Sequence, residues 1–390
     1  MRQTTPTEAT VLLAAGGTAG HLFPAFALAQ ELHRRAIAVD LVTDMRGDRY
    51  GSGFPARTIY RVPSATPAGR SPVTAAKALL TLGRGTFAAY GLLGRVRPAV
   101  IVGFGGYPTI PPLTAARLRR IPSLLHEQNA VLGRANRLLS RGVSAIATSF
   151  QTTRFLDGAL SVKARMTGNP VRDAVIGSIP AGYRPSANGE PFRLLVFGGS
   201  QGARFFSDAV PPALVALPPD LRERLAVTQQ CREEDIGRVR QTYAASGIKA
   251  ELATFFANLP DVMASSHLVI GRAGASSVAE LSVIGVPSIL VPLPHALDND
   301  QLQNATRLAD AGACWCVEQK DLTGARLADM LSRAMREPET LATSAAAARA
   351  QGRPDAALRL ADLVEELMGR RVAGGSAARP REQARLSEGN

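Results

Sequence analysis

The sequence contains 390 residues, of which 46% are hydrophobic and 20% charged, a composition that excludes disorder throughout. This length exceeds what one core usually holds and predicts two domains. The three cysteines include no C-x-x-C pair, which excludes a disulfide framework and argues against structural zinc. Without an apolar run of about 18 residues or a signal-peptide core, we expect no membrane span and no secretory leader.

The net charge of +13 is unevenly distributed along the chain. Residues 1–172 contain 22 Lys and Arg against 7 Asp and Glu, a net charge of +15, whereas residues 173–390 carry −2. An arginine-rich composition alone would raise both halves equally. The first half is therefore predicted to meet an anionic partner, which could be a membrane surface, a nucleic acid or a polyanionic substrate.

Short apolar runs alternate with helical patterns in the first half, which is typical of an α/β fold built on a parallel sheet. The expected strands are residues 10–15, 39–43, 99–103, 123–126 and 145–148. The expected helices are residues 24–35, 113–120 and 132–139.

A stretch rich in Gly, Pro and Ser, residues 177–191, predicts an interdomain linker, after which the alternation resumes. The expected strands are residues 193–197, 225–228, 267–270 and 288–291. The expected helices are residues 204–216, 233–246, 277–285, 300–311 and 355–368. Residues 369–390 are predicted to be disordered. The sequence thus predicts two Rossmann-like domains, residues 1–176 and 192–354, with parallel sheets facing a cleft where ligands bind.

Three glycine-rich turns each follow an expected strand and enter a helix, at residues 16–21, 103–107 and 198–203. Glycine allows positive φ and close backbone approach, and a helix N-terminus presents free N–H groups, so the turns predict sites for phosphate. None has the Gly-x-Gly-x-x-Gly spacing of a dinucleotide site, which disfavours a nicotinamide dehydrogenase. The P-loop motif is absent, which excludes an NTPase of that type.

His21 ends the first glycine turn, where a positive helix terminus disfavours imidazolium, so a neutral ring that acts as general base is predicted. The alternative is a histidine that only caps the turn. Small residues at 271–279 precede Glu280, whose carboxylate suits a ribose diol or simply lies favourably near a helix start. The amides at residues 299–304 suit sugar hydroxyls or a helix cap.

Residues 73–93 combine apolar side chains with arginines and lysine. Leu79, Leu80 and Phe87 together with Arg84 predict an interfacial helix or hairpin that dips into lipid headgroups. The alternative is an internal helix of the first domain. Three glycines within this segment argue against a single long helix.

Several motifs occur in order, namely GGTAGHLFPA at 16–25, GGY at 105–107, HEQN at 126–129, GNPVR at 168–172, GGSQGA at 198–203 and QLQNA at 301–305. Their combination resembles the MurG family of peptidoglycan glycosyltransferases, over residues 11–311. The resemblance implies a GT-B fold and inverting transfer of N-acetylglucosamine from UDP-N-acetylglucosamine to the C4 hydroxyl of MurNAc in lipid I, giving lipid II. It implies no cofactor and no metal.

The same resemblance implies a role for each matching residue. His21 is the expected base, and the expected donor-binding residues are Thr18, Ala19, Gly20, Asn129, Arg172, Ser200, Phe256, Ala275, Ser276, Ser277, Val278, Ala279, Glu280 and Gln301. Within this set, Arg172 and Ser200 approach the phosphates and Glu280 binds the ribose diol. Phe256 touches the uracil through backbone or stacking. Ala19 stands where many relatives have glycine, and Phe256 replaces a smaller aliphatic residue.

The resemblance also implies a peripheral protein on the cytoplasmic face of the bacterial inner membrane. Its first domain would bind the lipid I acceptor and the anionic membrane surface, and other cell-wall synthesis proteins are possible partners. The alternatives are another GT-B enzyme, such as a UDP-N-acetylglucosamine 2-epimerase or a glycolipid synthase, and a nucleic-acid binder. We expect no nucleic-acid partner, because aromatic residues are only 5% and no basic–aromatic motif occurs.

Overall fold

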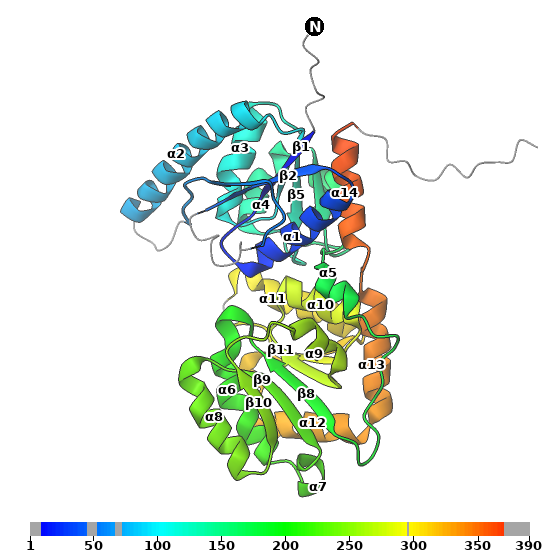
Figure 1. Cartoon of the computed structure of the whole chain (residues 1–390). Coiled ribbons are helices and arrows are strands. Elements are labelled where there is room, and N and C mark those ends of the chain that lie inside the picture. The colour runs from blue at the N-terminus through cyan, green and yellow to red at the C-terminus, as the bar shows by residue number, and fades with distance from the viewer. Residues whose placement is uncertain (1–8, 45–52, 67–71, 295, 370–390) are drawn as a thin grey trace, which may run out of the picture.

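The computed structural model describes residues 9–44, 53–66, 72–294 and 296–369. It has two lobes, one above the other in Figure 1, and each contains a parallel β-sheet covered by helices. The seven-stranded sheet of the first lobe has the order β3-β2-β1-β4-β5-β6-β7, and the six-stranded sheet of the second has the order β10-β9-β8-β11-β12-β13. The predicted α/β class with two Rossmann-like domains is confirmed.

In the first lobe, most strands lead into a helix that returns along the sheet. Its elements are β1 Thr10–Ala14, α1 Ala19–Arg34, β2 Ala38–Thr43, β3 Thr58–Arg61, α2 Pro72–Val96, β4 Val100–Gly103, η2 Tyr107–Thr109, α3 Ile110–Leu118, β5 Ser123–Glu127, α4 Arg134–Leu139, η3 Ser140–Gly142, β6 Ala145–Thr148, η4 Gly158–Lys163 and β7 Ala164–Met166. Helix α1 covers one face of the sheet, and α2, α3 and α4 cover the other.

The second lobe repeats this arrangement after the short helix α5, Asp173–Gly177. Its elements are β8 Phe192–Phe197, α6 Gly199–Val215, α7 Pro219–Arg222, β9 Leu225–Gln230, α8 Glu233–Ala245, β10 Lys249–Ala253, α9 Leu259–Ser265, β11 Leu268–Gly271, α10 Ala275–Ile284, β12 Ser288–Leu290, η5 Leu297–Asn299, α11 Asp300–Asp310, β13 Cys314–Cys316, η6 Gln319–Asp321, α12 Gly324–Arg336 and α13 Pro338–Gln351. A last helix, α14 Ala356–Leu367, follows.

Helices α1, α2 and α6 differ most from the sequence prediction, and α5, α7, α9, α12 and α13 were not predicted. Helix α6 begins at Gly199 rather than at residue 204, so most of the third glycine-rich turn lies inside the helix. Helix α1 begins at Ala19 rather than at residue 24, and it contains Pro24 within its second turn. Helix α2 is one continuous helix of 25 residues, although its glycines predicted an interruption. One of them has a packing reason, because a Cβ on Gly85 would lie 2.0 Å from the carbonyl oxygen of Pro63.

The chain crosses between the lobes earlier than the predicted linker at 177–191. Val171 and Val175 already pack in a core cluster of the second lobe. The predicted linker lies against that same lobe, where the Tyr183 hydroxyl donates a hydrogen bond to the carbonyl oxygen of His267 at 2.8 Å. The predicted disorder at 369–390 concerns a segment that, apart from Gly369, lies outside the described residues.

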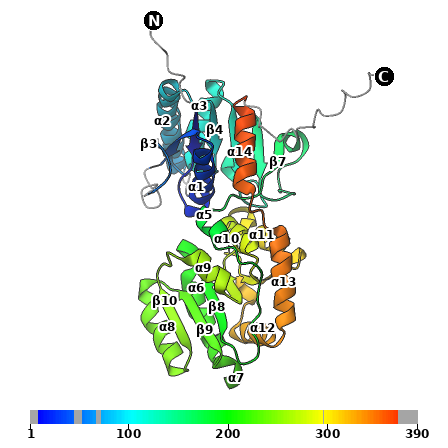
Figure 2. The same cartoon turned by 45° about the vertical axis from the view of Figure 1, so that its right-hand side comes forward.

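The chain then returns to the first lobe through α14, which lies beside α1 (Figures 1 and 2). Leu360 and Val364 of α14 are fully buried in the cluster that also holds Leu28 and Leu32 of α1. At its polar edge, Arg35, the residue that follows α1, forms an ion pair of 2.7 Å with Asp362. The first lobe is therefore completed by residues from the far end of the chain.

Leu360→Ala should destabilise the first lobe by about 2–4 kcal/mol, because truncating a fully buried leucine loses apolar burial and leaves a cavity. The matched control is Leu358→Ala on the same helix, whose side chain is 47% exposed and should change stability by less than about 0.5 kcal/mol. Guanidinium unfolding followed by circular dichroism measures both variants. Equal shifts would show that α14 does not contribute to this core.

Candidate active site

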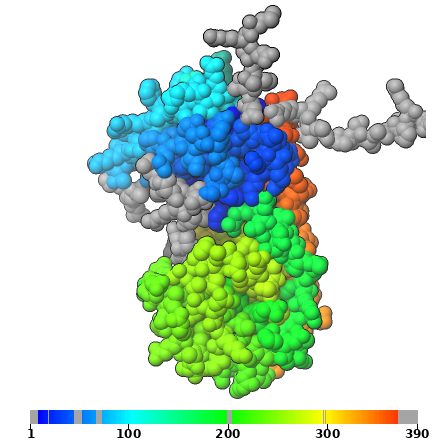
Figure 3. Space-filling model, in the orientation of Figure 1, coloured from blue at the N-terminus to red at the C-terminus, as the bar shows by residue number. Residues whose placement is uncertain are grey.

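A cavity of about 320 Å³ lies between the lobes at the carboxyl ends of three adjacent strands. Its first-lobe walls are the loops that follow β1, β4 and β5, and the second lobe contributes Asp298 and Asp300. Ligands of parallel α/β sheets bind at this end of the strands, so the cavity is the candidate site. Figure 3 shows the surfaces of the two lobes in direct contact on one side of the molecule.

His21 lies in the first turn of α1 and lines this cavity. Its Nδ1 is 3.2 Å from the carbonyl oxygen of Gly16 and 3.2 Å from the hydroxyl of Thr18. A carbonyl oxygen only accepts, so Nδ1 carries the proton in the neutral ring and Nε2 keeps its lone pair. Desolvation by burial lowers the pKa of His21 and so favours the neutral ring.

Two glycines of the second glycine-rich turn make room for this imidazole. Gly105 and Gly106 have φ values of 84° and 72°, which residues with a side chain rarely adopt. A Cβ on Gly106 would lie 3.1 Å from Cε1 of His21, tighter than most contacts. The turn therefore holds the ring in place by close backbone packing.

His126, another histidine near the cleft among the described residues, is not free to act as a base. It is fully buried, its Nε2 donates to the carbonyl oxygen of Gly168 at 3.1 Å, and its Nδ1 accepts from the Gln128 amide at 3.0 Å. Desolvation lowers its pKa to about 4. The structure thus distinguishes the two histidines by their hydrogen bonds.

Glu127, at the end of β5, organises the next wall of the cavity. Its buried carboxylate accepts from the backbone N–H groups of Asn129 and Gly133, at 3.0 and 2.8 Å, and from the Asn136 amide at 2.8 Å. Burial raises the pKa of this carboxyl, and these hydrogen bonds oppose the rise. The Oδ1 atom of Asn136 is buried without a hydrogen-bond partner in the described structure, which leaves an acceptor beside the cavity.

Asn129, a predicted sugar-binding residue, also links the two lobes. Its Oδ1 accepts from the Asn304 amide of α11 at 3.0 Å. Asn304 is fully buried, its Oδ1 accepts from the Ala130 N–H at 2.8 Å, and its Nδ2 also donates to the carbonyl oxygen of Ala273 at 3.1 Å. One amide side chain therefore joins loops of both lobes.

The predicted donor residues Thr18, Ala19 and Gly20 lie where α1 faces the second lobe. Pro24 has no N–H to donate to the carbonyl oxygen of Gly20 four residues earlier. That oxygen is instead 3.5 Å from the hydroxyl of Ser276 on α10, which donates to it across the interlobe interface. Thr18 is exposed and precedes the helix in an extended conformation, while the side chain of Ala19 lies outside the description.

The predicted segment 275–280 forms the first turns of α10, directly after β11 and Gly274. Its N-terminus lies at the interlobe interface, where the Asn169 amide donates to the carbonyl oxygen of Ala275 at 3.2 Å. Ala275, Val278 and Ala279 line a second, smaller cavity of about 110 Å³ between the lobes. Ser277 is partly exposed.

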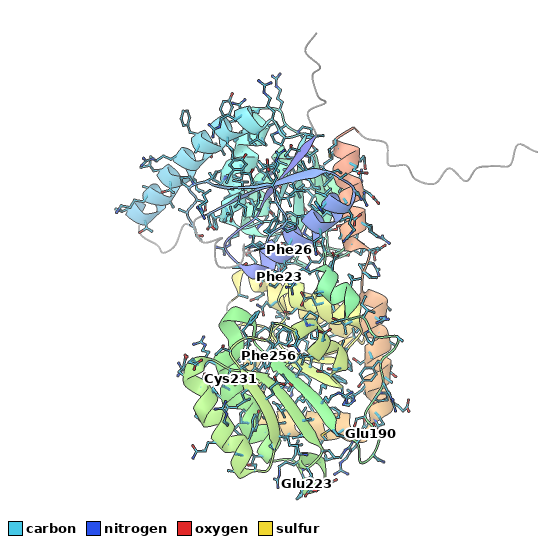
Figure 4. The ribbon with its side chains drawn as sticks, in the orientation of Figure 1. Phe23, Phe26, Glu190, Glu223, Cys231 and Phe256 are labelled. Carbon is cyan, nitrogen blue, oxygen red and sulfur yellow. The ribbon has the colours of Figure 1, made fainter. Side chains whose placement is uncertain are left out.

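Glu280 and Arg172 form an ion pair of 3.4 Å. Glu280 is buried, and desolvation raises the pKa of its carboxyl while the Arg172 charge opposes the rise. The guanidinium of Arg172 lies 3.9 Å from the ring centroid of Phe23, which Figure 4 shows on α1 beside the second lobe. Two residues predicted to bind different parts of the donor are thus in contact with each other.

Gln301 lies in the first turn of α11, where its Oε1 accepts from the N–H of Leu293 at 3.0 Å. Its own N–H donates to Asp300 Oδ1 at 2.7 Å. Burial raises the pKa of the Asp300 carboxyl, and the nearby Asp298 charge adds to the rise. Asp300 lines the larger of the two interlobe cavities, whereas Gln301 is not among the described residues that line it.

Phe256 lies in the second lobe and is not among the described residues that line the cavity beside His21. Phe256 is 8% exposed whereas Phe255 is 74% exposed, so the ring of Phe256 has little exposed surface on which a base could stack. Ser200 falls in the first turn of α6, and its side chain lies outside the description. The sequence prediction gave no role to Glu127, which lies within the HEQN motif, or to Asn136, which lies outside every motif. For Asn304 it named sugar binding or a helix cap, and not the hydrogen bonds to the first lobe.

The predicted membrane segment forms an exposed surface on α2. Leu79, Leu80 and Phe87 are 67%, 65% and 82% exposed, and with Gly83 and Arg84 they line a shallow hollow. Within the described part of the chain, none of the helices combines the length and apolarity needed to cross a bilayer. The described residues also contain no group of three or more His, Cys, Asp and Glu placed to hold a metal ion.

Family models match both lobes. The glycosyltransferase family 28 N-terminal domain matches residues 11–148, and the glycosyltransferase family 28 C-terminal domain matches residues 193–360.

Individual proteins match most of the chain. A protein of Bradyrhizobium sp. is 54% identical over 92% of this chain and 98% of its own length, and one of Allorhizobium ampelinum is 51% identical over 93% and 96%. Both are named UDP-N-acetylglucosamine--N-acetylmuramyl-(pentapeptide) pyrophosphoryl-undecaprenol N-acetylglucosamine transferase. The match to the crystal structure of Acinetobacter baumannii MurG spans 92% of this chain and 99% of that chain, with a TM-score of 0.75 and 28% sequence identity. The chain therefore belongs to glycosyltransferase family 28, in its MurG group.

Proposed function

We propose that this chain transfers N-acetylglucosamine from UDP-N-acetylglucosamine to N-acetylmuramyl-(pentapeptide) pyrophosphoryl-undecaprenol, which is lipid I, and so produces lipid II for peptidoglycan. The names of its close relatives support these substrates. The observation that carries the proposal is His21, whose Nδ1–H faces a carbonyl oxygen and whose Nε2 keeps a lone pair at an interlobe cavity.

In the proposed reaction the C4 hydroxyl of the acceptor sugar attacks the anomeric carbon of the donor. The new C–O bond forms on the face opposite the breaking bond to UDP, so the configuration inverts. Nε2 of His21 takes the hydroxyl proton, and the electron pair of the broken bond leaves with the diphosphate. The unpartnered Oδ1 of Asn136 offers an acceptor for another hydroxyl of the bound sugars.

The donor is proposed to lie against the second lobe, with its diphosphate at the N-terminus of α10 and near Arg172. Free N–H groups and a guanidinium stabilise the charge that develops on the leaving group, so the proposal requires neither a cofactor nor a metal ion. The residues proposed to bind the donor are Thr18, Ala19, Gly20, Asn129, Arg172, Ser200, Phe256, Ala275, Ser276, Ser277, Val278, Ala279, Glu280 and Gln301. Phe256 contributes through its backbone.

The first lobe is proposed to bind the lipid acceptor at an anionic membrane surface, on the cytoplasmic face of the bacterial inner membrane. The exposed apolar residues of α2 support this proposal, since they lie beside basic residues in the more positive half of the chain. We propose the first lobe as the acceptor domain and the second lobe as the donor domain. Relative to the predicted boundaries, residues 1–176 and 192–354, α5 then belongs with the second lobe and α14 with the first.

The activity itself is tested by transfer of radiolabelled sugar from UDP-N-acetylglucosamine to a short-chain lipid I analogue. The inverting mechanism predicts a labelled disaccharide-lipid product and free UDP in equal amounts, with turnover maintained in EDTA. Conversion of UDP-N-acetylglucosamine without acceptor would indicate an epimerase instead. Loss of turnover in EDTA would contradict the metal-independent mechanism.

His21→Ala should lower kcat by about 10²–10⁴-fold, the usual contribution of a general base, and leave UDP affinity nearly unchanged. Only the neutral ring accepts a proton, and the pKa of His21 is lowered from 6.5. As the pH is lowered, kcat/KM should therefore remain constant through pH 6.5 and begin to fall only when the pH approaches the lowered pKa. The control is His33→Ala, an exposed histidine on the same helix. An unchanged rate in His21→Ala would exclude this base.

Glu280→Ala should weaken UDP binding by about 10- to 100-fold, because a hydrogen bond to a charged group contributes about 1.5–3 kcal/mol. Isothermal titration calorimetry with UDP measures the change. Since the substitution also leaves Arg172 without its carboxylate, thermal unfolding must show that the variant is folded at the assay temperature. The control is Glu339→Ala, an exposed glutamate on α13, and equal affinities in both variants would remove Glu280 from the ribose site.

Leu79→Glu combined with Phe87→Glu should abolish flotation with vesicles that contain phosphatidylglycerol. The changes place two negative charges on the surface proposed to enter the headgroups. Leu358→Glu is the matched control, since this exposed leucine lies on α14, which covers the opposite face of the first-lobe sheet. Flotation of the double variant at the wild-type level would contradict membrane contact through α2.

A further inference from the structure

An ion pair joins the lobes at the edge of the larger cavity. Arg137 of α4, in the first lobe, donates to Oδ2 of Asp298 at 2.5 Å, and Nε of Arg134 lies 3.5 Å from the same oxygen. Asp298 belongs to the second lobe and immediately precedes Asn299 and α11. One carboxylate thus meets two guanidinium groups from the opposite lobe.

The backbone at this point adopts an unfavourable conformation. Asp298 and Asn299 both have left-handed backbone angles, with φ values of 58° and 54°, and neither is glycine. Aspartate and asparagine tolerate this region better than most residues, but two in succession persist only where the surroundings fix them. The contacts of Asp298 with Arg137 and Arg134 are such surroundings.

This turn determines where α11 begins. Asn299 is the residue before the helix, and Asp300 and Gln301 occupy its first turn. Asp298 and Asp300 are the second-lobe residues that line the larger cavity, opposite the wall formed by His21 and Glu127. A change in the turn would therefore move the only described second-lobe groups on that cavity wall, together with Gln301 beside them.

The ion pair is too exposed to hold the lobes together by its own energy. The Arg137 and Asp298 side chains are 31% and 22% exposed, and surface pairs of this kind contribute little to stability. The buried hydrogen bonds of Asn304, one turn farther along α11, already provide a firm attachment. The ion pair is better suited to order a short turn beside that attachment.

We propose that Asp298 is a positioning residue, whose carboxylate, bound by Arg137 and Arg134 of the opposite lobe, fixes the left-handed turn and so places Asp300 and Gln301 against the sugar of the donor. This inference rests on the proposed function, because that function supplies the sugar nucleotide. It assigns a role to the contact between lobes rather than to the nucleotide site.

The decisive variant is Asp298→Asn, because asparagine also tolerates the left-handed region and only the negative charge is removed. Its affinity for UDP-N-acetylglucosamine should fall by about three- to tenfold, as expected for an ordering contact of this strength, with UDP affinity unchanged. Calorimetry with the two nucleotides measures both. The variants should also keep the wild-type melting temperature. A role in folding alone would lower the melting temperature and would not separate the affinity for UDP-N-acetylglucosamine from that for UDP.

Arg137→Ala should reproduce most of this effect, since only the longer contact with Arg134 remains. The double variant Arg137→Ala/Asp298→Asn should bind no more weakly than Asp298→Asn alone, because that substitution already removes the carboxylate that Arg137 contacts. The matched control is Arg141→Ala, an exposed arginine that follows α4. Raising the salt concentration should weaken wild-type binding of UDP-N-acetylglucosamine relative to UDP, and should have less effect on Asp298→Asn.

Wild-type affinity of Asp298→Asn for UDP-N-acetylglucosamine, an equal loss for UDP, or additive losses in the double variant would overturn the inference. These measurements require binding and not turnover. A protein that binds the sugar nucleotide but does not glycosylate a lipid I analogue would therefore contradict the proposed function alone, while the role of Asp298 would still be decided by the two affinities.

Discussion

The shape of the cleft depends on one buried amide that joins the two lobes. Asn304 is fully buried, and its hydrogen bonds reach Asn129 and Ala130 in the first lobe and Ala273 in the second. Breaking them without replacement would leave buried donors and acceptors unpaired, which is costly in a nonpolar environment. Because the contacted loops follow β5 and β11, this amide holds the carboxyl ends of the two sheets at a fixed separation. The cavity beside His21 lies in the space between these two ends.

The strands that the sequence predicted and those it missed differ in their place in the sheets. The nine predicted strands are the interior strands of the two sheets, whereas the missed ones, β3, β7, β10 and β13, are the four edges. An interior strand of a parallel sheet is buried on both faces and appears as an apolar run. An edge strand is partly exposed, and β10 contains Lys249 and Glu251, so its pattern resembles that of a loop.

The site was predictable where it depends on local sequence, and not where it depends on contacts between lobes. In the turns at 16–21 and 103–107 the glycines themselves predicted positive φ, because residues with a side chain rarely adopt it. Gly17, Gly105 and Gly106 have such angles in the structure. Pro24 was interpreted as a helix start, which is its usual place. The helix tolerates it instead because Ser276, more than 250 residues away in sequence, donates to the carbonyl oxygen that Pro24 leaves unpaired. Sequence spacing carries no signal for such a partner.

Glu280 shows how much a contact between distant residues changes the meaning of a local pattern. As a charge near a helix start it would contribute only a few tenths of a kcal/mol to about 1 kcal/mol. In the structure it is buried, and its charge is compensated by Arg172. A buried carboxylate that lost this partner would be strongly destabilised. If a donor diphosphate attracts Arg172, the hydroxyls of the ribose must then supply hydrogen bonds to Glu280, so phosphate and ribose recognition are coupled through one ion pair.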